Sequence, residues 1–227
     1  MSAPRITRVG RGLGSPDDAR RPDQSGGDTP AVAQRPGGPT WARVNVVGTS
    51  CSGKTTLARA LAGQLGVPHV ELDALHWEPG WTAAEPEVLR QRVAAAVAAD
   101  RWVVDGNYSA TRDLVWARTT MVVWLNLPFG LVFGRSLART FRRIASREEL
   151  FNGNRESVRN LMDADGIPWW VIRTHHRRRR EYRELLTRPE FAHMAVIELR
   201  TPEEVAGCVA EIAAEAKTLG EGVARRV

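Results

Sequence analysis

The chain has 227 residues, which is enough for one domain with a sizeable core and some additional segments. Its net charge is +6, carried almost wholly by arginine, since Lys54 and Lys217 are its only lysines. The two cysteines, Cys51 and Cys208, exclude a disulfide-rich framework and show no zinc-ligand spacing. The longest apolar stretch, 121–134, is interrupted and too short to span a bilayer. We therefore expect a soluble, cytoplasmic protein without a membrane segment.

Residues 1–40 are rich in Gly, Pro, Ser, Asp, Gln and Arg and have no apolar periodicity, which predicts a disordered N-terminal extension. They contain no apolar run typical of a secretory signal, and their four aspartates argue against an organelle transit peptide. The domain itself is predicted over 41–220, followed by a C-terminal tail at 221–227.

The most informative motif reads G-T-S-C-S-G-K-T-T over 48–56, between a β-branched run at 44–47 and a helical pattern that ends at Gly66. It fits the G-x-x-x-x-G-K-[ST] pattern of a phosphate-binding loop, in which backbone N–H groups and a helix N-terminus surround phosphates. A glycine-rich turn capping an ordinary helix is the alternative. The expected ATP-binding residues are Gly48, Ser50, Cys51, Ser52, Gly53, Lys54, Thr55 and Thr56, together with Arg135 and Arg139, and the Thr55 hydroxyl is expected on Mg²⁺.

Further strands are predicted at 69–72, 102–104, 121–127 and 195–199, and helices at 85–99, 128–146, 169–186 and 202–219. Strands that alternate with helices predict a parallel sheet covered on both faces. We expect the three-layer α/β fold of P-loop NTPases, with a five-stranded parallel sheet. Ligands of such sheets bind at the carboxyl ends of the strands.

Two aspartates follow predicted strands at that end of the sheet. Asp105, before Gly106, is expected to organise Mg²⁺ beside the phosphates, although an aspartate in a turn is the simpler alternative. Asp73 opens a segment with Trp77 and Trp81 and is expected to orient or deprotonate an acceptor hydroxyl between aromatic walls. The alternative for Asp73 is a helix cap, with the tryptophans packed in the core or loop.

The segment 135–183 carries thirteen arginines against six acids, a balance of +7 that holds the whole charge excess. Arg135 and Arg139 lie at helical spacing, as do Arg173 and Arg177 on the next predicted helix. Two such helices joined by a polar segment predict a helical, arginine-rich lid that closes over the transferring phosphate. A solvated basic face is the alternative for most of these arginines.

The stretches G-T-S-C-S-G-K-T-T, L-D-A-L-H-W-E-P-G-W, R-W-V-V-D-G-N-Y-S and L-N-L-P resemble, in order and spacing, the adenylate-kinase-like P-loop kinases, and within them the topology modulation proteins. The resemblance covers about 43–200. It implies a core-and-lid kinase with ATP and Mg²⁺, Arg135 near the nucleotide, and Arg173 and Arg177 as lid arginines. Asn107 and Tyr108 stand where adenylate kinases have Phe and Pro, and Arg112 is the nearest candidate to hold an acceptor phosphate.

The expected function is an ATP-dependent phosphotransferase acting on a nucleotide or a small hydroxylated metabolite, as a monomer or homodimer. The expected catalytic residues are Lys54, Asp73, Asp105, Arg135, Arg173 and Arg177. Acceptor contacts are expected from Asp73, Trp77, Trp81, Asn107, Tyr108 and Arg112. The alternative is an ATP-binding regulator that contacts DNA through the basic segment, but a lid beside a phosphate loop makes nucleic acid the less favoured partner.

Overall fold

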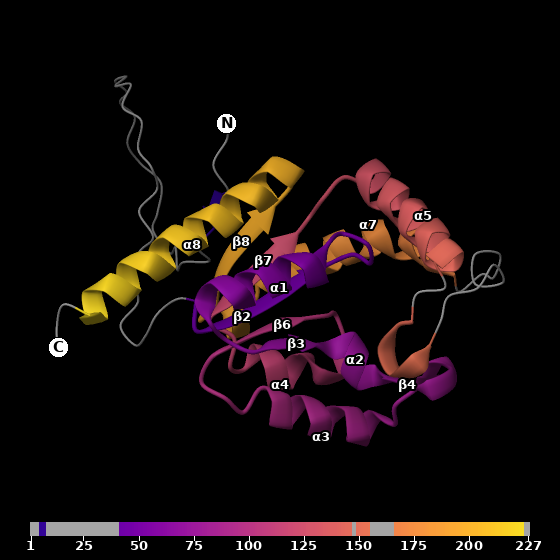
Figure 1. The fold of residues 1–227 in the computed structure, drawn as a ribbon, viewed down its shortest axis with the longest axis horizontal. Coiled ribbons are helices and arrows are strands. Elements are labelled where there is room, and N and C mark those ends of the chain that lie inside the picture. The colour runs from indigo at the N-terminus through magenta and orange to yellow at the C-terminus, as the bar shows by residue number, and fades with distance from the viewer. Residues whose placement is uncertain (1–4, 8–40, 147–148, 155–165, 225–227) are drawn as a thin grey trace, which may run out of the picture.

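The computed structural model describes residues 5–7, 41–146, 149–154 and 166–224. One sheet of six strands runs through them in the order β1-β8-β7-β2-β6-β3 (Figure 1). Five of its strands are parallel: β2 (Arg43–Gly48), β3 (His69–Glu71), β6 (Trp102–Asp105), β7 (Met121–Leu125) and β8 (Ala195–Leu199). The predicted five-stranded parallel sheet is therefore confirmed.

The sixth strand, β1 (Arg5–Thr7), pairs antiparallel with β8 and was not predicted. These three residues lie within the extension predicted to be disordered. The rest of that extension, 1–4 and 8–40, lies outside the described residues, as does the predicted tail beyond 224, so both remain predictions.

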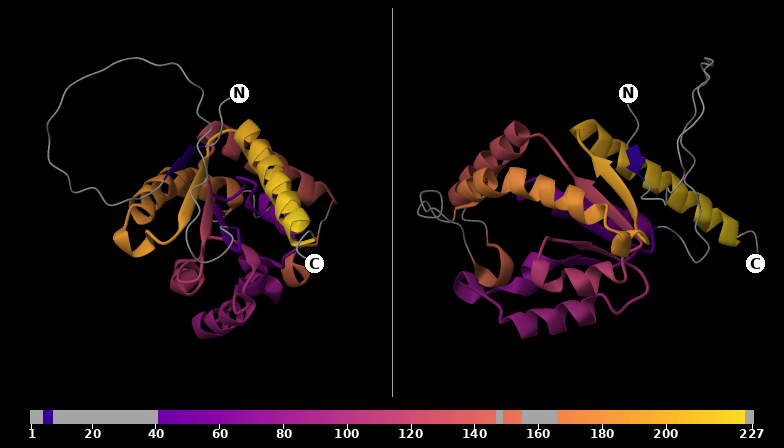
Figure 2. Two further views of the ribbon diagram at one scale, coloured as in Figure 1. Left: turned by 90° about the vertical axis from the view of Figure 1, so that its left-hand side faces the viewer. Right: turned by 180° about the vertical axis from the view of Figure 1, so that it is seen from behind.

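Helices cover both faces of the sheet (Figure 2). On one face, α1 (Lys54–Leu65) packs against α8 (Pro202–Ala224), and their apolar side chains meet alternate residues of β2, β7 and β8. On the other face lie α3 (Pro86–Ala96), α4 (Arg112–Trp116) and the C-terminal part of α7 (Ile167–Leu186). Because β2 alternates, Val44 and Val46 enter the first layer and Val47 the second.

The predicted lid region contains α5 (Phe129–Ser146), which packs along α7, and a short 3₁₀ turn η3 (Phe151–Gly153). The middle of that region, 155–165, lies outside the described residues. Tyr182, which the predicted lid includes, is 1% exposed and packs in the core with Leu185 and Leu186. The second half of α7 is therefore part of the domain core, which the sequence boundaries did not anticipate.

The region after β3 also differs from the prediction. Residues predicted to end a strand and enter a loop instead form a short helix, α2 (Leu72–His76). A small hairpin follows, in which β4 (Trp77–Glu78) and β5 (Thr82–Ala83) flank the 3₁₀ turn η1 (Pro79–Trp81). Two further 3₁₀ turns, η2 (Ser109–Thr111) and η4 (Pro189–Phe191), precede α4 and β8.

Candidate active site

The loop between β2 and α1 has the backbone of an anion cradle. Gly48, Cys51 and Gly53 have φ of 152°, 63° and 100°. A Cβ on Gly48 would lie 2.8 Å from the Leu125 carbonyl oxygen, so only glycine fits there. Left-handed residues among right-handed ones turn successive N–H groups to one side, where α1 adds the partial positive charge of its N-terminus.

The side chains of the loop complete this cradle. Lys54 Nζ donates to the Thr49 carbonyl oxygen at 3.1 Å. Burial lowers the pKa of Lys54, while the negative charges of Asp73 and Asp105 act in the opposite direction. Ser52 Oγ is buried without a hydrogen-bond partner. Ser50 is half-buried, and Thr56 is exposed in the first turn of α1.

A cluster of oxygen donors surrounds Thr55. Its hydroxyl lies 3.2 Å from Glu71 Oε1 and 3.3 Å from Asp105 Oδ1. Asp105 is 1% exposed, and its other oxygen lies 2.8 Å from His69 Nε2. Burial, and then the nearby charge of Asp105, raise the pKa of Glu71. Hydroxyl and carboxylate oxygens are the donors that Mg²⁺ prefers, together with phosphate and water oxygens. The predicted pair Thr55 and Asp105 therefore fits this ion.

Sequence reasoning missed Glu71 and His69. Both come from β3, whose parallel register sets Glu71 directly beside Asp105 of β6. The available signal was the spacing Glu71-Leu72-Asp73 at a strand end, of which only the second acid was used.

Asp73 lies in the first turn of α2, where Tyr108 donates its hydroxyl to Asp73 Oδ1 at 2.7 Å. Burial and the charge of Asp73 raise the pKa of Tyr108, so the phenol stays protonated and the carboxylate is the acceptor. The rings of Tyr108, His76, Trp77 and Trp81 follow one another with centroid separations of 4.5, 4.7 and 5.6 Å. The structure thus brings Asp73, Tyr108, Trp77 and Trp81 together, and their role in acceptor binding stays a prediction.

The hairpin that carries Trp77 and Trp81 is tied to the predicted lid region. The Asn154 side chain, which is 4% exposed, accepts a hydrogen bond from the backbone N–H of Trp81 at 2.8 Å and donates one to the Glu78 carbonyl oxygen at 2.9 Å. Asn152 donates to the Trp77 carbonyl oxygen. Trp81 has a φ of 58°, a strained value for an aromatic residue. These hydrogen bonds fix the backbone of the hairpin that carries the Trp77 and Trp81 rings.

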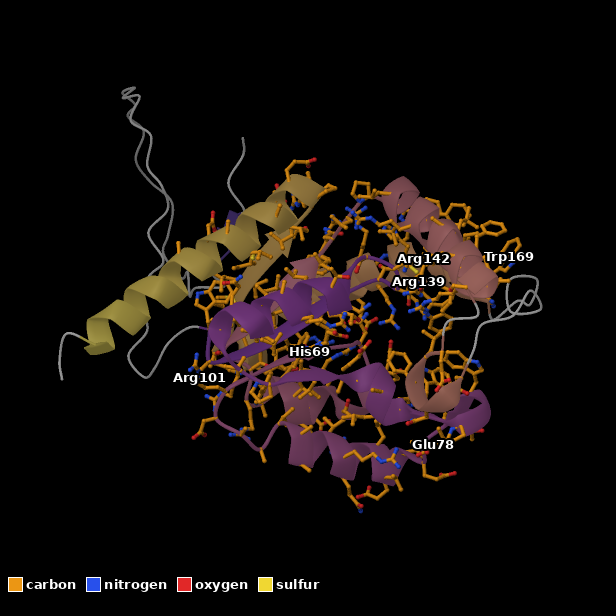
Figure 3. The ribbon with its side chains drawn as sticks, viewed as in Figure 1. His69, Glu78, Arg101, Arg139, Arg142 and Trp169 are labelled. Carbon is orange, nitrogen blue, oxygen red and sulfur yellow. The ribbon has the colours of Figure 1, made fainter. Side chains whose placement is uncertain are left out.

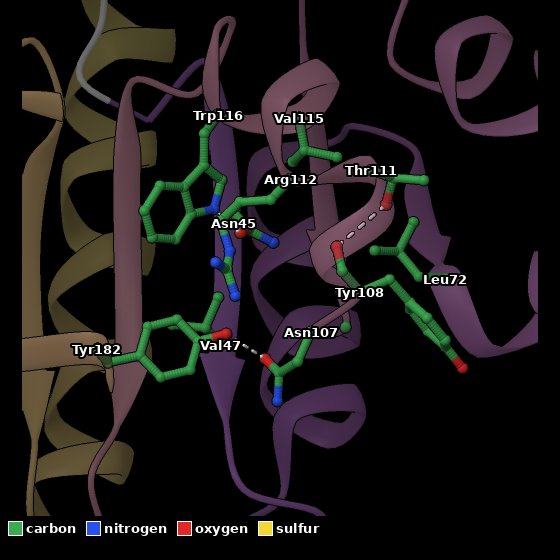
Figure 4. A pocket seen from close by; sticks show the side chains of 11 residues that line it. Asn45, Val47, Leu72, Asn107, Tyr108, Thr111, Arg112, Val115, Trp116 and Tyr182 are labelled. Atoms are coloured by element: carbon green, nitrogen blue, oxygen red, sulfur yellow. Dashed lines mark hydrogen bonds between the residues drawn. The ribbon is translucent and has the colours of Figure 1, made fainter. Parts of the chain in front are cut away.

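Two predicted acceptor contacts have other partners. Asn107 faces the phosphate loop, where it bonds both backbone groups of Gly48. Arg112 donates to Glu181 at 2.7 Å and lies over the Trp116 ring. Both residues line a cavity of about 10 Å³, the size of one water molecule, from which the Tyr108 ring points away (Figure 4).

The arginines of α5 and α7 lie on different faces of their helices, and only some of these faces are directed toward the phosphate loop. Arg135 Nη1 donates to the Ser52 carbonyl oxygen at 3.2 Å, and Arg139 and Arg142 follow on the same stripe of α5 (Figure 3). On α7, Arg173 and Arg177 are exposed and, at about 100° per residue, lie at least about 100° around the helix from Arg178.

Arg178, which was not predicted as a site residue, is half-buried, and its positive charge lowers the pKa of Lys54 and of Tyr108. It shares a helix face with Val171, Tyr182 and Leu185, all of which are buried. That apolar periodicity is the signal that could have found it. Arg178 is therefore the arginine of α7 that faces the phosphate loop.

Within the described ranges, no group of three or more His, Cys, Asp and Glu side chains has the arrangement of a protein-only metal site. None of the helices in the same ranges is long and apolar enough to cross a bilayer.

Comparison with known proteins gives one partial family match. The model of the ATPase family associated with various cellular activities (AAA) matches residues 44–104, from β2 to β6. No curated protein sequence matches the chain.

Several solved structures are similar at low identity. A gluconokinase from Sinorhizobium meliloti 1021 is 17% identical, with 82% of this chain and 98% of that chain covered and a TM-score of 0.45. A shikimate kinase from Bacteroides thetaiotaomicron is 16% identical, with coverage of 78% and 98% and a TM-score of 0.45. A shikimate kinase from Acinetobacter baumannii in complex with shikimate is 20% identical, with coverage of 76% and 91% and a TM-score of 0.43.

Because these TM-scores are below 0.5, we assign the fold from the features of this chain alone. These are a parallel sheet covered on both faces, and a phosphate loop that joins its central strand β2 to α1. The chain therefore has the α/β fold of a P-loop NTPase.

Proposed function

We propose that the protein is an ATP-dependent phosphotransferase that acts on a small hydroxylated metabolite. The observation that carries the proposal is the position of Asp73. Its negative charge raises the pKa of Lys54 in the phosphate loop, and its carboxylate accepts a hydrogen bond from the Tyr108 hydroxyl at 2.7 Å. A carboxylate that binds a hydroxyl beside a phosphate cradle can orient that hydroxyl toward the γ-phosphate and take its proton.

The donor half of the site is assigned to the loop and its neighbours. The N–H groups at the N-terminus of α1, together with Lys54, would bind the β and γ phosphates of ATP. Thr55 and Asp105, with Glu71 beside them, would hold Mg²⁺, which neutralises phosphate charge when bound. Arg135 and Arg178 are positioned to add guanidinium charge around the transferring group.

The acceptor half favours a hydroxylated compound over a nucleoside monophosphate. Arg112, the candidate for an acceptor phosphate, is engaged by Glu181 at 2.7 Å and by the Trp116 ring. A phosphorylated acceptor would have to displace Glu181, whereas a hydroxyl needs only Asp73. The rings of Trp77, Trp81 and Tyr108 offer apolar surface for the carbon skeleton.

The test is a screen of sugars, hydroxy acids, nucleosides and nucleoside monophosphates, measured as acceptor-dependent ADP release. Lys54→Ala should abolish release with the best acceptor, and Lys217→Ala, at the only other lysine, should retain it. Unchanged release by Lys54→Ala, or a nucleoside monophosphate as the best acceptor, would contradict the proposal. The narrower resemblance to topology modulation proteins remains a prediction that the same screen would inform.

One observation favours the alternative of a DNA-contacting regulator. A groove of about 260 Å³ on α7 is lined by His176, Arg179, Arg180 and Arg183. Around the helix these residues lie about 100° to 160° from Arg178, so they face away from the phosphate loop. Filter binding at two salt concentrations decides the matter, because a phosphate-contacting surface loses affinity steeply with salt, and Arg179→Gln with Arg183→Gln would reduce that slope.

A further inference from the structure

Asn107 occupies an unusual position for a residue predicted to contact an acceptor. Its side-chain oxygen accepts from the Gly48 N–H at 3.3 Å, and its amide nitrogen donates to the Gly48 carbonyl oxygen. The side chain therefore satisfies both backbone groups of the first loop glycine, as a neighbouring strand would. Gly48 is also where the loop is sterically tightest, since a Cβ would lie 2.9 Å from Ser52 Oγ.

The same oxygen of Asn107 has a second donor from a distant part of the chain. Tyr182 of α7 donates its hydroxyl to Asn107 Oδ1 at 2.9 Å (Figure 4). Tyr182 is 1% exposed, and burial raises its pKa to about 12, so the phenol is a permanent donor near neutral pH. Core packing of its ring fixes the direction in which this donor points.

We infer that Asn107 and Tyr182 form a clasp that sets the shape of the phosphate loop and makes nucleotide affinity depend on the position of α7. The inference rests on the proposed function in that it assigns the loop to a nucleotide. Both residues are positioning residues, because neither is placed against the nucleotide.

The link from the clasp to the nucleotide runs through consecutive residues. Asn107 fixes the Gly48 peptide, which leads to Thr49, and the Thr49 carbonyl oxygen accepts from Lys54 Nζ at 3.1 Å and from the Ser52 N–H at 3.2 Å. A rotation of the Gly48 peptide would therefore move the lysine and the loop N–H groups together.

The clasp also places an arginine. Arg178 precedes Tyr182 by four residues, so both lie on the same face of α7, and the charge of Arg178 acts on Lys54. Docking of Tyr182 on Asn107 thus sets the loop and brings Arg178 toward it. The pair couples the segment after β6 with the core-packed half of α7.

The experiment measures the affinity of the fluorescent nucleotide mant-ADP for the full chain. Tyr182→Phe deletes one hydroxyl and should weaken binding about three- to tenfold, the effect of one hydrogen bond. Asn107→Ala should weaken it more, because it leaves both Gly48 groups unpaired. The double variant should match Asn107→Ala alone, since the hydroxyl acts only through the asparagine.

The matched control deletes another hydroxyl at the C-terminal end of α7, that of Thr187, which donates to the Glu184 carbonyl oxygen at 2.9 Å. Thr187→Val should leave mant-ADP affinity unchanged. An unchanged affinity in Tyr182→Phe, or a double variant whose loss is the product of the two single losses, would overturn the clasp. If Asn107→Ala does not fold, Tyr182→Phe alone still decides.

The two proposals fail separately. Normal mant-ADP binding by Tyr182→Phe together with acceptor-dependent ADP release would refute the clasp and leave the phosphotransferase. The predicted losses of mant-ADP affinity, with no acceptor phosphorylated, would support the clasp and refute the phosphotransferase.

Discussion

Replacing Asp73 by Asn separates phosphoryl transfer from nucleotide binding. Asn has nearly the shape of Asp and keeps an oxygen that accepts the Tyr108 hydroxyl, now at 2.7 Å from the carboxylate, so α2 and the aromatic wall should keep their positions. What is lost is the charge that takes up the acceptor proton. General-base catalysis contributes about 10²- to 10⁴-fold, so kcat for ADP release with the best acceptor should fall by that factor.

Nucleotide affinity should respond differently to the same change. The negative charge of Asp73 raises the pKa of Lys54, so its removal weakens the support of that ammonium but also removes a repulsion toward the phosphates. Titration with mant-ADP should therefore show unchanged or slightly tighter binding. Equal losses in ADP release and in nucleotide affinity would refute the reasoning and indicate that Asp73 serves the local structure. Retained transfer by Asp73→Asn would refute the assignment of the base.

Two further predictions concern stability. Gly106 has a φ of 134°, and a Cβ there would lie 2.7 Å from a core side chain, so Gly106→Ala should lower the free energy of unfolding in urea by about 2–5 kcal/mol. Gly63 lies in α1 with open space around it, so Gly63→Ala should raise the free energy of unfolding by about 0.5–1 kcal/mol. Destabilisation by both changes would contradict this account. Burial lowers the pKa of His175 below 6.5, so the unfolded chain binds more protons and stability should fall as pH drops through about 6.5. Thermal unfolding at pH 7.5 and 5.5 should show a smaller loss in His175→Gln, and an equal loss would exclude this histidine.

The sequence alone located the phosphate loop, because that loop is local in the chain. The backbone of 48–53, Lys54 and the start of α1 are contiguous, and glycine, lysine and threonine are required there by backbone angle, charge and metal affinity. The five parallel strands followed from apolar runs that alternate with helical periodicity.

Other site residues depend on contacts that no local pattern specifies. The register of β3 against β6 sets Glu71 beside Asp105, and the rotation of α7 turns Arg178 toward the loop while Arg173 and Arg177 remain exposed. Both depend on how buried faces pack, and packing involves residues far apart in the chain.

Asn107 shows most clearly what each level decides. The sequence by itself determined that a polar residue follows the Asp-Gly turn at the carboxyl end of β6, near the phosphate loop. Only the tertiary structure decided that this side chain bonds Gly48 and accepts a hydrogen bond from the hydroxyl of Tyr182, which lies 75 residues away in the chain. The reason is physical: a backbone conformation is set by neighbouring residues, whereas a buried hydrogen bond exists only once folding has brought donor and acceptor together.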